Sequence, residues 1–283
     1  MRGIRYSFFL TLMLVLAMQA LTIPALAEDL DDNTPNGQSL RVIDRGTVKQ
    51  VLKSDMIMLD DDKRYRLENI LVPPFEEAPA IDELKHEFLS KPVAIYAYHA
   101  VEDDQEKSGV VPYAHVVTTK GIWVQQDLVS KGLAWAQCTE TSPQTVGVLK
   151  QSEEKARVDR LGFWKNPAYA IKSPDNVKDF IDSYQIVEGK ITSVLVSSNT
   201  GFVGFNFGKE KKRVFAIRFT NDNQFQAFWN DPVTSERSEV GLNLWKGRTV
   251  RVRGWVKDGG DGVPVIVLTR KEQLDVVMPP GEQ

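Results

Sequence analysis

The chain has 283 residues, of which 42% are hydrophobic and 26% are charged, as in an ordinary globular protein. This length is enough for two modest domains, and the sequence shows no solenoid-period repeat and no long low-complexity tract. The formal net charge of −3 argues against a protein coated by nonspecific nucleic-acid contacts, although it leaves room for a local basic patch.

The first 27 residues have the order of a secretory signal peptide. Two arginines precede an almost wholly apolar run at 7–23, and a small-x-small cleavage site ends at Ala27. The apolar run is short for a spanning helix, so cleavage after Ala27 is favoured over an uncleaved membrane anchor. We therefore expect a periplasmic or secreted protein with no membrane span after cleavage. The mature chain then has 33 Lys and Arg against 38 Asp and Glu, a net charge of −5.

Residues 42–166 have the pattern of a first module that follows a disordered, acidic leader at 28–41. Proline cannot donate a hydrogen bond to a ladder, so Pro73 and Pro74 end a strand at 70–72. Alternating apolar residues predict strands around a turn at 53–55 and near 65–67, 70–72, 93–96 and 113–117. Helical spacing predicts helices at 80–90, 122–136 and 146–162.

A second module is predicted at 185–278, after a linker at 167–184 that contains prolines and many charges. Val-Arg alternation at 250–256 predicts a half-buried strand with its arginines on the wet face. A hairpin turn is expected at 259–262, a short helix at 223–229 and a tail at 279–283. About five strands with little helix in roughly 90 residues favour a small barrel of the OB type.

Cys138 is the single cysteine, so no internal disulfide is possible. A structural role is favoured over a nucleophilic one, because no histidine partner is indicated for the thiol. The histidines, His86, His99 and His115, are scattered without metal-ligand spacing, so we predict no metal site.

Three stretches of the first module resemble the staphylococcal nuclease (thermonuclease) family. Residues 64–70 are similar to the family's R-x-R-L-x-G-I strand, 121–134 to its G-x-x-V-N-x-x-L-V-x-x-G-L-A helix, and 153–164 to its last helix and the aromatic end of that helix. The resemblance implies a five-stranded OB barrel with three helices. Residues 185–277 resemble the extra domain that follows some exported thermonuclease-like proteins, which looks like a second OB fold. The expected class is mainly β with helices (α+β), built from two OB-type five-stranded barrels.

The resemblance also implies which residues would carry out phosphodiester hydrolysis. The family uses two carboxylates on Ca²⁺, two arginines and a carboxylate base. Asp55 matches one metal carboxylate and Arg66 matches one arginine. Leu71 replaces the other metal carboxylate, Pro74 replaces the base, and Val110 replaces the second arginine. Leucine and proline side chains offer no lone pair, so Asp55 and Arg66 are expected to persist only as a structural pair beside the old cleft.

Neighbouring residues are the possible substitutes for the missing groups. Glu76 and Glu77 are candidates for the lost carboxylates, and Lys107 or His115 for the lost arginine. Because loss of one such group costs orders of magnitude in rate, replacement of all three is disfavoured. We expect no intact catalytic residue and no cofactor, with Ca²⁺ relevant only if nuclease activity survives.

The second module is more basic than the first. Residues 185–277 contain 14 Lys and Arg against 10 Asp and Glu, a net charge of +4 that leaves −9 for the rest of the mature chain. Basic residues beside aromatics are typical of a single-strand nucleic-acid platform. A charged hairpin tip with aromatics that fill a small barrel is the favoured alternative. The opposite charges suggest that the modules dock on each other. The candidate binding residues are Lys209, Lys211, Lys212, Arg213, Arg251, Arg253, Phe205 and Phe207.

Three functions remain open on sequence grounds. The favoured one is an exported, non-catalytic binding or scaffold protein with an unknown protein partner. The second is a weak or altered calcium-dependent phosphodiesterase or nuclease. The third is a periplasmic single-stranded nucleic-acid binder that acts through the second module. Fold resemblance alone does not decide among them.

Overall fold

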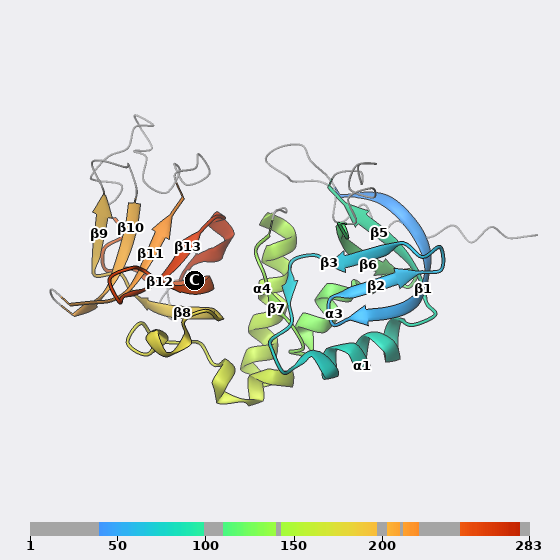
Figure 1. Ribbon diagram of the computed structural model, residues 1–283, viewed down its shortest axis with the longest axis horizontal. Helices are drawn as coiled ribbons and strands as arrows, with labels where there is room; N and C mark the ends of the chain where they lie inside the picture. Colours follow the sequence, from blue (N-terminus) through green and yellow to red (C-terminus); the bar gives the residue numbers. More distant parts are fainter. Residues whose placement is uncertain are drawn as a thin grey trace, which may run out of the picture.

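The chain folds into two β-rich modules that lie on either side of helix α4 (Pro143–Val158) (Figure 1). The predicted class, mainly β with helices, is confirmed. The predicted signal peptide, most of the leader, the helix at 223–229 and the tail lie outside the described residues. The computed structural model describes residues 40–98, 110–139, 143–196, 203–209, 212–220 and 244–277.

The first module is a closed five-stranded barrel in the order β1-β2-β3-β6-β5. β3 and β6 pair in parallel, and the other neighbours pair antiparallel. The predicted turn at 53–55 joins β1 to β2. Leu40 is already buried, so the ordered fold begins slightly before the predicted boundary at residue 42. The strands are β1 (Arg41–Lys53), β2 (Met56–Leu59), β3 (Arg64–Leu67), β5 (Pro92–Ala97) and β6 (Tyr113–Thr118).

Three α-helices accompany this barrel within the described residues, as predicted: α1 (Glu77–Phe88), α3 (Val124–Ser130) and α4. α1 packs Ala80, Leu84 and Phe88 into the barrel core, because these residues fall on one face at helical spacing. The prediction of a helix over 122–136 is wrong at its end. The helix stops at Ser130, and the chain returns as β7 (Trp135–Ala136), which pairs with β4 (Ile70–Leu71).

Two glycines allow the backbone after α3 to contact the backbone after α4 closely. Gly132 has φ +66° and Gly162 has φ +51°, a left-handed conformation that favours glycine. Gly162 opens a short 3-10 helix, η1 (Gly162–Lys165), in which the Phe163 N–H donates to the Gly132 carbonyl at 3.0 Å. A Cβ on Gly162 would lie 2.0 Å from the same oxygen, so a larger residue there must push the two segments apart.

The second module is a curled sheet with the order β14-β12-β13-β11-β10-β9, and β8 also pairs with β12. β8 and β9 are separated only by Ile191 and Thr192. When they are counted as one interrupted strand, the pairing order repeats that of the first barrel, including one parallel pair, β11 with β13. The predicted turn at 259–262 joins β12 to β13. The strands are β8 (Tyr184–Lys190), β9 (Ser193–Val196), β10 (Val203–Lys209), β11 (Lys212–Phe219), β12 (Thr249–Asp258), β13 (Pro264–Leu268) and β14 (Leu274–Val276).

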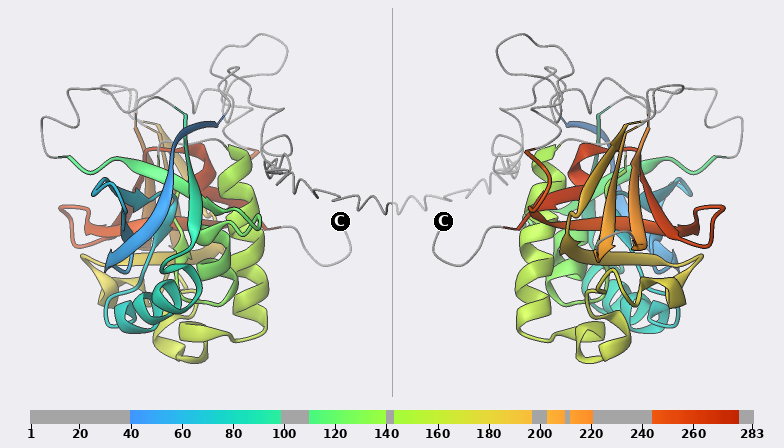
Figure 2. Two further views of the ribbon diagram at one scale, coloured as in Figure 1. Left: turned by 90° about the vertical axis from the view of Figure 1, so that its right-hand side faces the viewer. Right: turned by 90° about the vertical axis from the view of Figure 1, so that its left-hand side faces the viewer.

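The segment predicted as a linker connects the modules but is itself packed. It contains the 3-10 helices η2 (Pro167–Tyr169) and η3 (Val177–Phe180). Lys172 adds a short parallel bridge to β8, and Val177 is fully buried in the core of the second module. Figures 1 and 2 show these turns at the same end of the molecule as α1.

The glycine contact between α3 and α4 gives a direct test of the fold. We expect Gly162→Ala to lower the free energy of unfolding by more than about 1 kcal/mol, because the left-handed φ and the close carbonyl both oppose a Cβ. Gly147→Ala is the matched control, since Gly147 lies within α4 and a Cβ there meets nothing within 4 Å. It should raise stability by about 0.5–1 kcal/mol. Urea denaturation compares the two variants, and equal effects would contradict this account.

Candidate functional site

Asp55 and Arg66, the two residues that match the nuclease site, come together as predicted. The Arg66 Nε lies 3.4 Å from the Asp55 Oδ2. The Arg66 Nη1 donates to the Tyr113 hydroxyl at 3.4 Å, and the guanidinium lies 5.6 Å from the centre of the Tyr113 ring. The bond to Tyr113, and then the charge of Asp55, raise the pKa of Arg66 against the effect of burial. The guanidinium is therefore engaged within the protein, which is the structural pair that the sequence suggested.

The positions of the missing carboxylates serve a different purpose in this fold. Leu71 packs against a cluster of aromatic residues at the junction of the two modules. The Pro74 carbonyl accepts a hydrogen bond of 2.9 Å from the hydroxyl of Tyr169, which lies in the linker. Val110, at the position of the second arginine, is exposed. The segment that would hold a metal and a base in the family is thus tied to the linker and the second module.

The suggested substitutes do not rebuild the site. Glu76 lies beside Tyr169, where burial and then the Glu76 carboxylate raise the pKa of the tyrosine. Glu77 begins α1 and is exposed. In the described part of the chain no hydrogen bond or ion pair joins Glu76 or Glu77 to Asp55 or Arg66. The described contacts therefore tie Glu76 to the linker rather than to the matched pair.

His115 also fails as a replacement for the lost arginine, because it is buried and neutral. Its side chain is 1% exposed, and burial lowers its pKa to about 3. The Nε2 lies 3.8 Å from the carboxylate of buried Glu68, and the ring meets Trp123 edge-on at 5.3 Å. Neither ring nitrogen has a hydrogen-bond partner within the described residues. The other proposed replacement, Lys107, lies outside them.

Glu68 is a buried polar residue of this region that the sequence analysis missed. It follows Arg66 by two positions, in the turn directly after β3. That spacing was the available signal, and an acidic residue beside a matched arginine could have been noted. The structure places the Glu68 carboxylate 3.8 Å from the His115 Nε2.

Calcium does not fit the residues at the old cleft. The ion takes six to eight oxygen ligands, usually from several carboxylates. Of the two matched carboxylate positions only Asp55 supplies an oxygen, and Arg66 competes for it. No group of three or more His, Cys, Asp or Glu in the described ranges is arranged to hold a metal ion.

The predicted stacking surface on the second module is wrong for three of its residues. Phe205 and Phe207 are 0% and 1% exposed, because alternate residues of β10 face the core of the second module. Arg253 is 3% exposed. The favoured alternative, aromatic residues that fill the barrel, is confirmed for Phe205 and Phe207. Lys212 is exposed, Arg213 pairs with Asp261, and Lys211 lies outside the described residues, as does the side chain of Lys209 at the end of β10.

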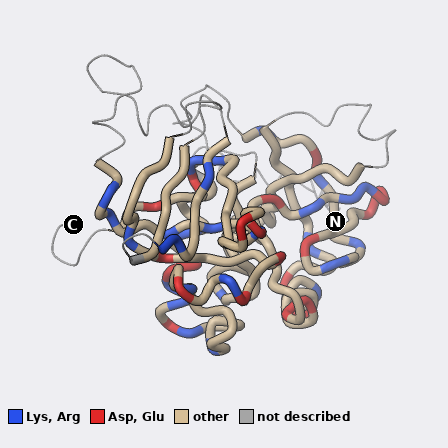
Figure 3. The backbone as a smooth tube through the Cα atoms, turned by 60° about the vertical axis from the view of Figure 1, so that its left-hand side comes forward, with Lys and Arg blue, Asp and Glu red and all other residues tan. Residues whose placement is uncertain are grey.

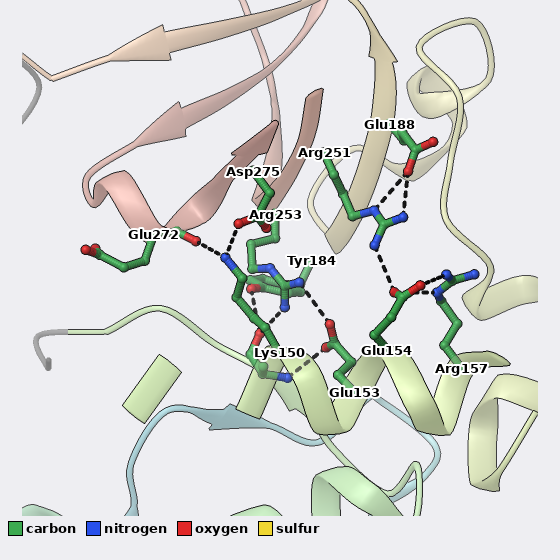
Figure 4. A network of polar contacts seen from close by, with 11 residues as sticks. Lys150, Glu153, Glu154, Arg157, Tyr184, Glu188, Arg251, Arg253, Glu272 and Asp275 are labelled. Carbon is green, nitrogen blue, oxygen red and sulfur yellow. Dashed lines mark hydrogen bonds and ion pairs between the residues drawn. The ribbon is translucent and has the colours of Figure 1, made fainter. Parts of the chain in front are cut away.

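Arg253 instead joins the two modules. Its guanidinium pairs with the Glu153 carboxylate of α4 at 2.9 Å and donates to the Ala136 carbonyl at 2.8 Å (Figure 4). Glu153 also accepts from the Ala136 N–H at 2.8 Å. Burial opposes the charge on Arg253, but the nearby Glu153 carboxylate outweighs that effect and raises the arginine's pKa. Both charges are therefore removed from water and fully partnered.

Further ion pairs surround this buried pair. Arg251 is held at 2.9 Å by Glu154 of α4 and at 2.8 Å by Glu188 of its own module. Lys150 of α4 pairs with Asp275 of β14, so in this pair α4 supplies the cation and the second module supplies the carboxylate. The predicted docking between the oppositely charged modules is confirmed by these contacts (Figure 4). Arg251 and Arg253 are thus committed to the junction rather than to a nucleic acid.

An aromatic cluster continues the junction. The ring of Trp135 lies 5.4 Å from Phe163, 5.8 Å from Tyr169 and 5.6 Å from Tyr184, measured between centroids. These residues come from the first module, the linker and β8, so the cluster ties all three parts together. Cys138 lies nearby, and burial raises the pKa of its thiol to about 11, which keeps it protonated and unreactive at neutral pH.

Comparison with known families agrees with this architecture. The family model for staphylococcal nuclease homologues matches residues 72–166, so the first module contains a staphylococcal nuclease homologue domain. The match includes α1, α3 and α4 and begins after Asp55 and Arg66. A comparison with curated proteins finds no match for the chain. Among the described helices, none has the length and apolar character needed to cross a bilayer.

The buried pair makes a strong stability prediction. Arg253→Met should lower the free energy of unfolding by about 3–5 kcal/mol, because it leaves the Glu153 carboxylate buried without a cation. Lys257→Met is the control, since it breaks an exposed pair with Asp182 and should cost less than about 1 kcal/mol. Urea denaturation gives both values. A loss of less than 1 kcal/mol for Arg253→Met would show that the junction does not depend on this pair.

Burial of His115 predicts that the free energy of unfolding depends on pH. Its folded pKa of about 3 lies below the ordinary value of 6.5, so between these pH values only the unfolded chain binds the proton. The stabilisation is fully present above pH 6.5 and is lost as the pH falls toward 3. His115→Phe keeps the edge contact with Trp123. It should reduce the dependence of the unfolding free energy on pH by up to about 1.4 kcal/mol per pH unit. Urea denaturation at pH 7 and pH 4.5 measures the difference. Equal slopes in both proteins would contradict the burial argument.

Proposed function

We propose that the protein is an exported, non-catalytic binding protein in which the staphylococcal nuclease-like module acts as a scaffold for the second module. The observation that carries this proposal is the position of Leu71 and Pro74 in the structure. Both stand where the family has acidic groups, and both contact the junction or the linker instead. A phosphodiester bound beside Arg66 would find neither a general base nor the second metal carboxylate.

Export is proposed from the sequence of residues 1–27, which has the charge, apolar run and cleavage site of a signal peptide. The protein would then act in the periplasm or outside the cell. The ion pairs and aromatic contacts of the junction support a rigid two-module body, and rigid bodies lose less entropy when a partner binds.

A cleavage assay tests the catalytic half of the proposal. Purified mature protein is incubated with labelled single-stranded DNA, with Ca²⁺ or with a chelator, and a staphylococcal nuclease with an intact site is the positive control. We expect no calcium-dependent cleavage above background, because two carboxylates and one arginine of the family site are absent. Arg66→Ala should leave that background unchanged.

The decisive comparison is between two variants in the presence of Ca²⁺. Asp55→Ala removes the one matched metal carboxylate, and Lys257→Ala is a surface control on the second module. Cleavage by the wild type that disappears in Asp55→Ala and persists in Lys257→Ala would overturn the proposal. Salt-sensitive DNA binding without cleavage would instead direct attention to exposed basic residues such as Lys212.

A further inference from the structure

An exposed apolar strip lies on the outer face of the second module. Trp255, Val267 and Ile181 are 47%, 43% and 40% exposed. Trp255 pairs with Tyr184 of β8 on one side, and the register of β12 with β13 places Val267 beside it on the other. The backbone N–H of the residue after Ile181 donates to the Val256 carbonyl, so Ile181 adjoins the same strand. We call these three residues the Trp255 strip.

The charges around the strip are already compensated. Lys257 pairs with Asp182 at 2.8 Å, and its ammonium lies 6.0 Å from the Trp255 ring. Arg218, which is opposite Val267 in the β11–β13 register, donates to the Gly259 carbonyl at 3.1 Å. Figure 3 shows positive and negative residues interspersed over the described backbone of this module. In the part of the rim that the structure describes, donors and acceptors therefore lie side by side in the Lys257–Asp182 pair.

The strip also rests on a rigid base. Arg253 is two residues before Trp255 on the same face of β12, and it is fixed to Glu153 in the junction. Tyr184, which meets Trp255 edge-on at 6.1 Å, packs in turn on Trp135. An aromatic residue held from below in this way loses little freedom when a ligand covers it, which favours binding.

We propose that the Trp255 strip is a binding site for a neutral oligosaccharide. An indole surface packs well on the apolar C–H face of a sugar ring, and the sugar hydroxyls both donate and accept hydrogen bonds. The paired Lys257 and Asp182 match that mixture. A nucleic-acid strand requires cations that are free to neutralise phosphates, and Lys257, the cation beside Trp255, is already paired with Asp182.

The inference rests on the proposal that the chain is a binding protein, but not on the absence of nuclease activity, so the two can fail separately. The test uses the full mature protein and three neutral hexasaccharides: β-1,4-linked glucose, α-1,4-linked glucose and β-1,4-linked N-acetylglucosamine. Binding is followed by calorimetry and by tryptophan fluorescence. We expect at least one of the three to bind, with an affinity that changes little between 50 mM and 500 mM salt, because no ion pairs with the ligand are formed.

Three variants make the test specific to the strip. Trp255→Ala should weaken binding by about tenfold or more, the effect expected for loss of an aromatic contact and its buried area. Trp255→Phe keeps a ring and should retain most of the affinity, and it guards against a folding defect in the alanine variant. Phe75→Ala is the control, since Phe75 is 95% exposed on the first module and should have no effect.

Two results would overturn the proposal. The first is failure of all three hexasaccharides to bind at millimolar concentration, or binding that is unchanged in Trp255→Ala. The second is binding of a twelve-residue oligothymidylate that is salt-sensitive and lost in Trp255→Ala, which would assign the strip to nucleic acid. Neither result bears on DNA cleavage, which the assay with Ca²⁺ reports separately.

Discussion

The structure depends most on the buried contact between Arg253 and Glu153. Two opposite charges that leave water lose solvation free energy, and they regain it only when each is paired and hydrogen-bonded. Here the Ala136 backbone supplies the remaining partners, its carbonyl for Arg253 and its N–H for Glu153. Because Glu153 lies on α4, this helix belongs to the packing of both modules. Separation of the modules would break this ion pair and the hydrogen bond from Arg253 to the Ala136 carbonyl.

The same junction occupies the segment where the resemblance to the nuclease family implies missing carboxylates. β4 carries Leu71 and pairs with β7, whose Trp135 packs against Tyr184 of the second module. An aspartate in place of Leu71 would lie against this aromatic cluster, where a charge without a partner is costly. Pro74 is held through its carbonyl by Tyr169 of the linker. Contacts that orient the second module thus occupy the segment that supplies carboxylates in the resembling family.

The junction also determines which part of β12 remains exposed to solvent. Every second residue of β12 points to the same face of the strand, and on one face these residues are Arg251, Arg253, Trp255 and Lys257. α4 covers the first two through Glu154 and Glu153, and it leaves the last two open to solvent. Two of the basic residues of the second module, Arg251 and Arg253, are therefore used in the junction. Beyond the junction, β12 presents Trp255, which is 47% exposed, and Lys257, which pairs with Asp182.

The sequence by itself indicated the two modules, most strands and helices, and the nuclease resemblance, which in turn implies that the base and one metal carboxylate are missing. These follow from local periodicity and from side-chain chemistry at matched positions. It also suggested the Asp55–Arg66 pair and the docking of the modules. Only the tertiary structure decided where Phe205, Phe207 and Arg253 point. A period of two defines the two faces of a strand, but not what covers each face. For Arg253 that cover is Glu153 on α4, which is distant in sequence, and its position depends on the fold of the whole chain.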